Sequence, residues 1–329
     1  MTTMTRRTAM GLLAATALAT PALAQQKITL KLGWTTGDGA QDPYAIGARA
    51  FKEEIEQRSG GRIEVQLFPN RALGDERPML DGMRLGTVDM GIITNAVIAQ
   101  IEPAFQINDM PFLFRDEAQA QRVLDGPVGD QLRQRLDGRG IGALGYMEGG
   151  FRHMINNVRP INTPDDVKGV KFRVLQSPIY IGLFTSLGGT AVPMAWGETF
   201  TAVQQGAVDG LEIPAAVIDA NKYNEVTRYL SLTNHIYSMI GLLISKRAFD
   251  RLPADLKTAV QEAGKAATAK QRAQAGANAR QIVEQLRAKG MQVNALPDVA
   301  PFRRAVMPMY ESFRQQIGAD IVRDALAAQ

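Results

Sequence analysis

Segments in which apolar and polar residues alternate are separated by segments in which apolar residues recur at helical spacing. Ile63, Val65 and Leu67 show the first pattern, which is typical of a strand with one buried face. The helical pattern of residues 44–58 stops at Gly60 and Gly61, as helices commonly do. The predicted strands cover residues 28–32, 62–68, 88–93 and 170–174, and the predicted helices cover 44–58, 75–85 and 198–205. This alternation of strands and helices predicts an α/β fold with open sheets.

A sequence pattern occurs twice. Residues 86–97 read GTVDMGIITNAV and residues 206–217 read GAVDGLEIPAAV, and each follows an amphipathic helix. Two similar α/β lobes with a ligand cleft between them would produce this repeat. The alternative is chance similarity of a common helix–turn–strand unit. Asp89 and Asp209 hold equivalent places in the repeat and are predicted to be structural turn residues.

The last third of the chain changes character. Residues 231–244 are predicted to form one extended strand, and residues 253–289 show a very long alanine-rich helical pattern. The alternative to one long helix is two helices broken near Gly264 or Gly276. Helical segments from 301 to 328 close the chain.

Residues 1–24 have the features of a secretory signal peptide. Arg6 and Arg7 come first without an acid, an apolar run follows over residues 9–19, and Ala22-Leu23-Ala24 forms an A-x-A cleavage site before Gln25. The apolar run is much shorter than the roughly 20 residues that span a bilayer. The sequence therefore predicts an exported protein that does not itself span the membrane; the alternative is a buried N-terminal helix.

Composition limits the classes of function. A chain of 329 residues with 45% hydrophobic and 21% charged residues is long enough for two domains. Its net charge of +4 falls to about +2 when Arg6 and Arg7 leave with the signal peptide, so no nucleic-acid partner is predicted. The chain contains no cysteine, which excludes disulfides, thiolate catalysis and iron–sulfur chemistry.

The sequence motifs of known catalytic and cofactor sites do not indicate such a site in this chain. Residues 140–145, GIGALG, match the dinucleotide fingerprint, but a helical pattern precedes them and a strand pattern follows, the reverse of what the fingerprint requires. His153 and His235 are the two histidines, and no zinc, nucleophile-elbow or calcium motif is present. No pair of acids is marked out by its spacing. Neither an enzyme nor a metal site is predicted.

Arg173 is a charged residue within a predicted strand. It lies in KGVKFRVLQSP, residues 168–178, on the strand face opposite Val170, Phe172 and Val174. In a sheet covered on both faces, an arginine there is costly unless a negative group meets it. The guanidinium suits a carboxylate, because two parallel N–H groups can donate to its two oxygens. That carboxylate is either a ligand or an internal acid such as Glu212.

Several ordered motifs together resemble one family. LGDERPML (73–80), LGTVDMG (85–91), DMPFLFRD (109–116), the segment from 148 to 178 and PMAWGETFTAVQQGAVDGLEIP (193–214) are similar to the extracytoplasmic solute-binding subunits of TRAP transporters. The resemblance runs from about residue 28 to beyond 245. It implies a protein of the periplasm that binds a small organic acid without catalysis and delivers it to the membrane permease subunits of an ion-gradient-driven transporter.

The resemblance also implies the architecture. It predicts the two-lobed fold of periplasmic binding proteins, with open mixed sheets, a ligand cleft between the lobes and a long C-terminal helix. The expected organisation is a signal peptide over 1–24, lobe I over 27–148 completed by about 240–280, and lobe II over 149–239 completed by about 281–329.

Site residues follow from matching positions. The family's K-x-R-V arginine, which binds the ligand carboxylate, is Arg173, and the G-F-R arginine, a common second contact, is Arg152. Trp196 is a candidate for stacking on the ligand, or else belongs to the core. Glu76 either reaches the cleft or is a solvated helix start, and Thr35 follows the first strand, where a loop faces the cleft. Glu212 either orients Arg173 or helps to hold a cation beside the ligand, as in some family members; no other cofactor is expected.

Two departures from the family bear on the ligand. Many members have an asparagine where this chain has Ile213, and several place a carboxylate where Thr94 stands. An apolar wall at Ile213 would leave the hydroxyl groups of a richly hydroxylated ligand unpaired. The sequence therefore predicts a C4-dicarboxylate or a short keto or hydroxy acid and disfavours a sialic acid. The alternatives to transport are a secreted α/β enzyme acting on a small carboxylic acid and a sensory protein that presents its ligand.

Overall fold

A computed structural model describes residues 27–327 of the chain, so the predicted signal peptide lies outside the described residues. The strands pair into one mixed sheet with the order β2-β1-β3-β9-β4-β7-β5-β6, while β8 pairs with β4 and β10. The strands are β1 (Ile28–Gly33), β2 (Ile63–Phe68), β3 (Met90–Thr94), β4 (Ile141–Asn156), β5 (Lys171–Val174), β6 (Thr190–Pro193), β7 (Gly210–Pro214), β8 (Tyr229–Leu232), β9 (Tyr237–Ser245) and β10 (Gln292–Ala295).

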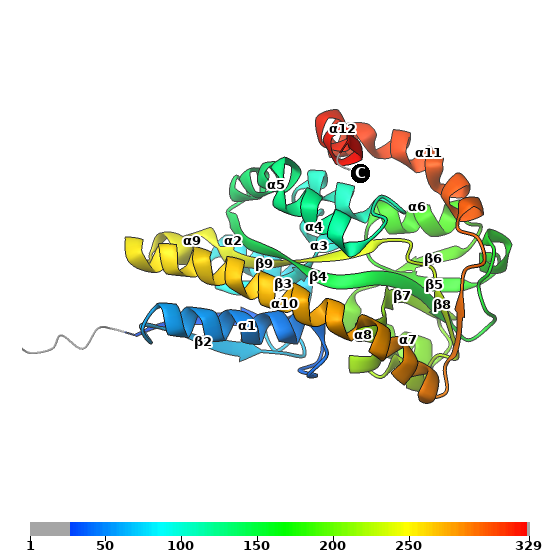
Figure 1. Cartoon of the computed structure of the whole chain (residues 1–329), viewed down its shortest axis with the longest axis horizontal. Coiled ribbons are helices and arrows are strands. Elements are labelled where there is room, and N and C mark those ends of the chain that lie inside the picture. Colours follow the sequence, from blue (N-terminus) through cyan, green and yellow to red (C-terminus); the bar gives the residue numbers. More distant parts are fainter. Residues whose placement is uncertain (1–26, 328–329) are drawn as a thin grey trace, which may run out of the picture.

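Helices cover both faces of the sheet. Figure 1 shows α3, α4, α5 and α6 on one side of the long strands β4 and β9, and α10 with α8 on the other. The helices are α1 (Pro43–Arg58), α2 (Glu76–Leu85), α3 (Asn95–Ile98), α4 (Glu117–Asp125), α5 (Pro127–Asp137), α6 (Pro178–Ser186), α7 (Trp196–Gln204), α8 (Ala215–Ala220), α9 (Lys246–Asp250), α10 (Ala254–Ala288), α11 (Ala300–Ile317) and α12 (Ala319–Ala327), with 3-10 segments η1 (Pro103–Asp109), η2 (Pro164–Val167) and η3 (Tyr223–Glu225). This is the predicted two-lobed α/β fold with its long C-terminal helix.

The sheet is built from two equivalent halves. Read from either edge, each half has a strand pair, β2-β1 or β6-β5, followed by a third parallel strand, β3 or β7. The repeated sequence motif supplies those third strands. Asp89, just before β3, accepts a hydrogen bond from the backbone N–H of Lys31 in β1 at 3.0 Å, and Asp209, just before β7, accepts one from Lys171 in β5 at 2.7 Å. The repeat is therefore structural, and both aspartates are turn residues as predicted.

Two long strands and one long helix connect the halves. β4 pairs with β9 over its first part and with β7 over its last part, and bulges interrupt its pairing between Ala143 and Gly145 and between Glu148 and Gly150. The helix α10 packs on α1 in the first half, on α8 in the second and on β4 between them. The helical pattern of residues 253–289 is thus confirmed as one helix, unbroken at Gly264 and Gly276.

One predicted element is wrong. Residues 231–244 do not form a single strand; β8 ends at Leu232 and β9 begins at Tyr237. Asn234 has a φ of 45°, a left-handed conformation that no strand accommodates. The Thr233 hydroxyl and His235 Nδ1 lie 2.7 Å apart and fix this turn locally. The glycines of 140–145 open β4 and no helix follows them, so the dinucleotide motif is a chance match.

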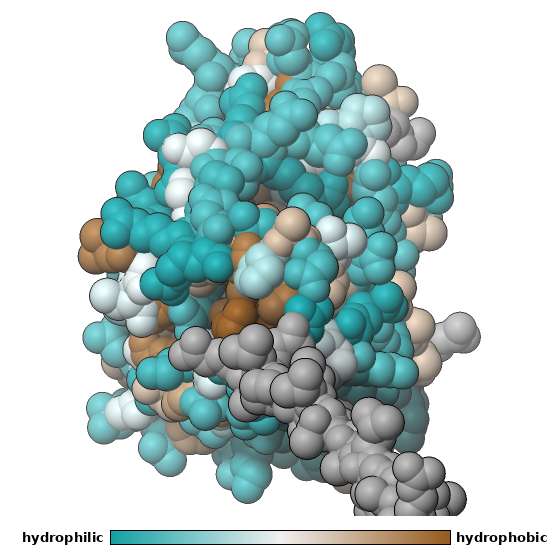
Figure 2. Space-filling view, turned by 90° about the vertical axis from the view of Figure 1, so that its left-hand side faces the viewer, coloured by the Kyte–Doolittle hydropathy of each residue, from teal (hydrophilic) through white to brown (hydrophobic). Residues whose placement is uncertain are grey.

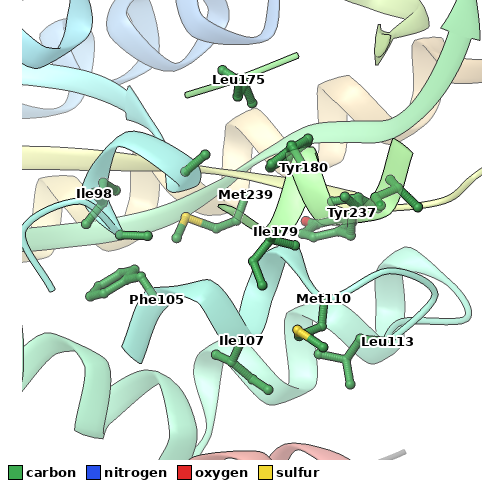
Figure 3. Packing of buried hydrophobic residues seen from close by; sticks show 14 of the residues in the cluster. Ile98, Phe105, Ile107, Met110, Leu113, Leu175, Ile179, Tyr180, Tyr237 and Met239 are labelled. Atoms are coloured by element: carbon green, nitrogen blue, oxygen red, sulfur yellow. The ribbon is translucent and has the colours of Figure 1, made fainter. Parts of the chain in front are cut away.

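The core lies on both sides of the sheet. In Figure 3, Met239 of β9 lies between Phe105 of η1 and Ile179 of α6, while Ile107 lies on the other side of η1. A second apolar cluster fills the space between the sheet and the helices α1, α8 and α10. The end of the molecule seen in Figure 2 is mostly hydrophilic, with a small group of hydrophobic residues near its middle. Burial on both faces means that charged side chains inside the sheet need partners.

Candidate functional site

A small, partly open cavity lies at the carboxyl ends of the parallel strands in both halves of the sheet. β1 and β3 lead into it from one half, and β5 and β7 lead into it from the other. Open α/β sheets bind ligands at this place, where the strand order reverses. The residues that line the cavity are Thr35, Thr36, Tyr44, Glu76, Thr94, Arg152, Arg173, Leu175, Trp196, Ile213, Pro214 and Val217.

Arg173 lies in β5 and is 1% exposed. Its Nε and Nη2 donate to the backbone carbonyl oxygen of Met194 at 3.1 and 2.7 Å. Its Nη1 is buried and has no hydrogen-bond partner among residues 27–327. Burial lowers the pKa of the guanidinium below its ordinary value. The side chain is thus fixed by one carbonyl and presents a charged donor at the cavity wall.

Glu212 pairs with Arg152 rather than with Arg173. Its Oε2 and Oε1 accept from Nε and Nη2 of Arg152 at 2.5 and 2.9 Å, and both side chains are buried. Arg152 Nη2 also donates to the Glu212 carbonyl oxygen at 2.6 Å, and Nη1 donates to the Ser238 hydroxyl at 3.2 Å. These four bonds leave one of the five guanidinium N–H groups, on Nη1, for another partner. The prediction that Glu212 orients Arg173 is wrong; it orients Arg152.

His235 completes this buried cluster. Its Nε2 lies 3.2 Å from Glu212 Oε2, and burial lowers the pKa of the ring, which fits a neutral imidazole that donates through Nε2. Burial alone would raise the pKa of Glu212, but Arg152 and His235 hold it below its ordinary value. The Glu212 carboxylate is therefore ionised, and both of its oxygens accept hydrogen bonds from side chains. This arrangement disfavours a cation at Glu212, and residues 27–327 contain no group of three or more His, Cys, Asp or Glu side chains placed to hold a metal ion.

A second polar network lines the opposite wall of the cavity. Glu76, at the start of α2, accepts from the backbone N–H of Thr94 at 2.8 Å and from its hydroxyl at 2.7 Å. The Tyr44 hydroxyl lies 2.8 Å from Thr94 Oγ1 and donates to it, since the Thr94 proton points to Glu76. Burial raises the pKa of Glu76 to about 7. This wall offers the oxygen atoms of a carboxyl group to a ligand.

The structure brings the predicted site residues together. Seven of the eight line one cavity: Arg173, Arg152, Ile213, Trp196, Glu76, Thr35 and Thr94. Glu212 lies directly behind them, bonded to Arg152. Trp196 stands at the start of α7, with its ring centroid 5.9 Å from the Arg173 Cζ and 5.5 Å from the ring of Tyr223. It therefore contacts both the cavity and the core of its own half.

The sequence analysis missed part of the lining. Tyr44 opens the predicted helix over residues 44–58 and was not a candidate site residue, yet its hydroxyl belongs to the Glu76 network. Leu175, Pro214 and Val217 provide an apolar wall beside Ile213. The signal for Pro214 and Val217 was present in the repeated motif, because the equivalent segment of the first half carries Thr94. No signal in the sequence set Tyr44 apart from other helix residues.

Direct contacts join the two halves around the cavity. Asn221, which follows α8, accepts a hydrogen bond from the Gly37 N–H at 3.1 Å and donates to Asp42 Oδ2 at 3.3 Å. On another side, Gln100 donates to the carbonyl oxygen of Gln176 at 3.0 Å. Groups from the two halves are thus hydrogen-bonded to each other on two sides.

The sequence around this cavity is similar to that of known proteins. A sequence model described as bacterial extracellular solute-binding protein, family 7, matches residues 35–316. This chain belongs to that family. The family 7 match spans every residue of the cavity, and a solute-binding protein of Verminephrobacter eiseniae is 40% identical over 308 residues, 94% of this chain and 91% of the relative.

Solved structures agree with the family 7 assignment. A TRAP periplasmic solute-binding protein from Bordetella, with density assigned as pantoate, is 37% identical and has a TM-score of 0.88 over 92% of this chain and 100% of its own. Another from a Polaromonas species, bound to D-erythronate, is 36% identical with a TM-score of 0.88 over 92% and 99% of the two chains. The resemblance to TRAP solute-binding subunits is confirmed. Within residues 27–327, no helix is both long and apolar enough to cross a membrane.

Proposed function

We propose that this protein captures a small organic acid in the periplasm and delivers it to the permease subunits of a TRAP transporter. Arg173 carries the proposal, because this residue lines the cavity and its buried Nη1 has no partner among the described residues. A ligand carboxylate supplies the missing acceptor, with Arg173 donating to it. The remaining N–H of Arg152 Nη1 gives a second contact.

The mechanism is capture without chemistry. The carboxylate docks on Arg173 in one half of the sheet, and closure then adds Glu76, Thr94 and Thr35 from the other half. The signal peptide over residues 1–24 directs export, and the closed form is the one that the permease recognises. Similar solved structures are described with pantoate, D-erythronate, galactonate, glucuronate and succinate, which supports a small organic acid as the ligand class.

Thermal melting of the mature protein against a panel of organic acids tests the proposal. An acid present at about 100 times its Kd adds about 2.7 kcal/mol to the free energy of unfolding, which raises the Tm visibly. Arg173→Ala and Arg173→Lys should lose the shift, since lysine lacks the planar fork. Arg314→Ala is the control, because Arg314 is exposed, pairs with Glu311 on its own helix α11 and does not line the cavity.

A ligand that copurifies would hide the shift, so the protein is also denatured and its released small molecules are identified by mass spectrometry. A carboxylic acid released from the wild type and missing from Arg173→Ala supports the proposal. No shift with any acid and no released acid would overturn it.

A further inference from the structure

The net charge of the side chains that line the cavity suits some organic acids better than others. Three strongly ionisable side chains line it: Glu76, Arg152 and Arg173. Arg152 is already neutralised by the two oxygens of Glu212. One positive charge, that of Arg173, is left for a ligand, and it faces a cavity that also contains a carboxyl group.

The two walls differ in hydrogen-bonding character. Arg173 offers N–H donors, whereas Glu76 presents a carboxyl whose Oε1 is held in place by the Thr94 N–H and hydroxyl. The hydroxyl of Thr36 is directed to Asp42 at 2.9 Å and is not available as a donor to a ligand. A ligand that enters with its carboxylate on Arg173 therefore has its other end near Glu76, which is a hydrogen-bond acceptor.

From this asymmetry we infer that the cavity selects singly charged acids that carry a hydroxyl group and rejects dicarboxylates of the same size. At pH 8, above the raised pKa of Glu76, a hydroxyl donates to the ionised carboxylate. A second carboxylate would there either lie beside a like charge or require Glu76 to take up a proton, and both cost binding free energy. This inference rests on the proposed function. It chooses the short hydroxy acid over the C4-dicarboxylate, both of which the sequence predicted.

The apolar wall limits where that hydroxyl can be. Leu175, Ile213 and Val217 cover one side of the cavity and are at most 8% exposed, so a hydroxyl directed at them would lose its hydrogen bond to water. Glu76 and Thr94 lie on the other side. The favoured ligand has its hydroxyl groups on the edge that faces Glu76.

Matched pairs of acids test the inference by calorimetry. D-erythronate and meso-tartrate differ in one terminal group, CH₂OH in the first and a carboxylate in the second, and glycerate and tartronate form the same kind of pair. In any pair that binds, the singly charged member should bind at least about 100-fold more tightly to the wild type at pH 8. Circular dichroism confirms that each protein is folded.

Glu76→Gln identifies the residue responsible. Glutamine keeps the size and the acceptor for Thr94 but removes the charge and adds a donor, so the preference for the singly charged member should fall by about 100-fold. Glu198→Gln is the matched control, because Glu198 is an exposed acid in the first turn of α7 and does not line the cavity. It should leave the preference unchanged.

The outcomes separate this inference from the proposed function. Equal or tighter binding of the dicarboxylate by the wild type overturns the charge selection and leaves the capture of an organic acid standing. A dicarboxylate released from the denatured protein has the same meaning. If no member of any pair binds and no acid is released, the proposed function fails, and the inference fails with it.

Discussion

The carboxylate of Glu212 grips the guanidinium of Arg152 through both of its oxygen atoms, at 2.5 and 2.9 Å, in a part of the protein that solvent does not reach. The two side chains come from neighbouring antiparallel strands. Arg152 lies opposite Pro214, and Glu212 lies opposite Met154, so the pair is diagonal on one sheet face. Because of this pair, the charge of Arg152 is neutralised inside the protein. Arg173 has no carboxylate partner among residues 27–327, which is why we propose it as the residue that binds the ligand.

Breaking the Arg152–Glu212 pair should be costly. We predict that Arg152→Met lowers the free energy of unfolding by about 3–5 kcal/mol, since it leaves a buried carboxylate without its counterion. The double variant Arg152→Met with Glu212→Leu should lose less than the sum of the two single variants. Urea denaturation measures both effects. Arg314→Met is the control and should change stability by less than about 1 kcal/mol, because its pair with Glu311 is exposed. Strict additivity of the two single variants would contradict the prediction.

Asn221 should matter for ligand affinity more than for folding. Its side chain joins Gly37 and Asp42 across the edge of the cavity, so its bonds hold the closed form. Asn221→Ala should weaken Kd by roughly five- to thirtyfold, the equivalent of about 1–2 kcal/mol, with little change in the Tm of the unliganded protein. Asn221→Asp keeps the size but faces Asp42 with a like charge, and its effect should be larger. A drop in unliganded Tm with an unchanged Kd would show that these bonds serve the fold alone.

The unliganded protein should be more stable at mildly acidic pH than at pH 8. Burial raises the pKa of Asp42 to about 6 and of Glu76, Asp109 and Glu148 to about 7, above the ordinary values for these acids. A raised pKa in the folded state means that the folded protein binds more protons than the unfolded chain, so stability falls as pH rises from about 4 to beyond 7. Chemical denaturation between pH 5 and 8 checks this. Glu148→Gln should flatten the curve, and a stability that rises across this window would contradict the prediction.

Two glycines of α10 should respond to alanine in opposite directions. A Cβ at Gly264 would lie 2.7 Å from Leu144 Cβ and 2.8 Å from the Leu144 carbonyl oxygen, so Gly264→Ala should separate the helix from β4 and cost about 1–3 kcal/mol. A Cβ at Gly276 meets nothing within 4 Å, and Gly276→Ala should stabilise the protein by roughly 0.5–1 kcal/mol. Thermal melting of the two variants side by side distinguishes them. Equal effects would mean that helix propensity, not packing, decides at both sites.

Much of the fold could be predicted from local patterns, and the misses have physical reasons. The strands and helices of the first half follow from apolar periodicity. The repeated Val-Asp motif indicated a second, similar half, in which Asp209 forms the turn equivalent to that of Asp89. The break between β8 and β9 depends on Asn234 in a left-handed conformation, which an apolar run on either side conceals. Domain boundaries stay predictions.

The sequence predicted which residues gather at the site, but not which of them pair with each other. Whether Glu212 meets Arg152 or Arg173 depends on the register between β4 and β7, which no local pattern encodes. Tyr44 was missed for a similar reason, because its role depends on Thr94, 50 positions away in the sequence. Residue types indicate which chemistry is possible, while strand register decides which partners meet.

The burial of the site side chains has a consequence for the rates of exchange. Arg173, Glu76 and Thr94 are at most 6% exposed, so a ligand held by them is largely shielded from bulk water. On the proposed mechanism, release waits for the two halves of the sheet to separate, which moves β4, β9 and α10, the elements that run through both halves. Different ligands would then leave with similar half-lives whenever opening is slower than escape, and the protein would discriminate among them during entry, before it closes.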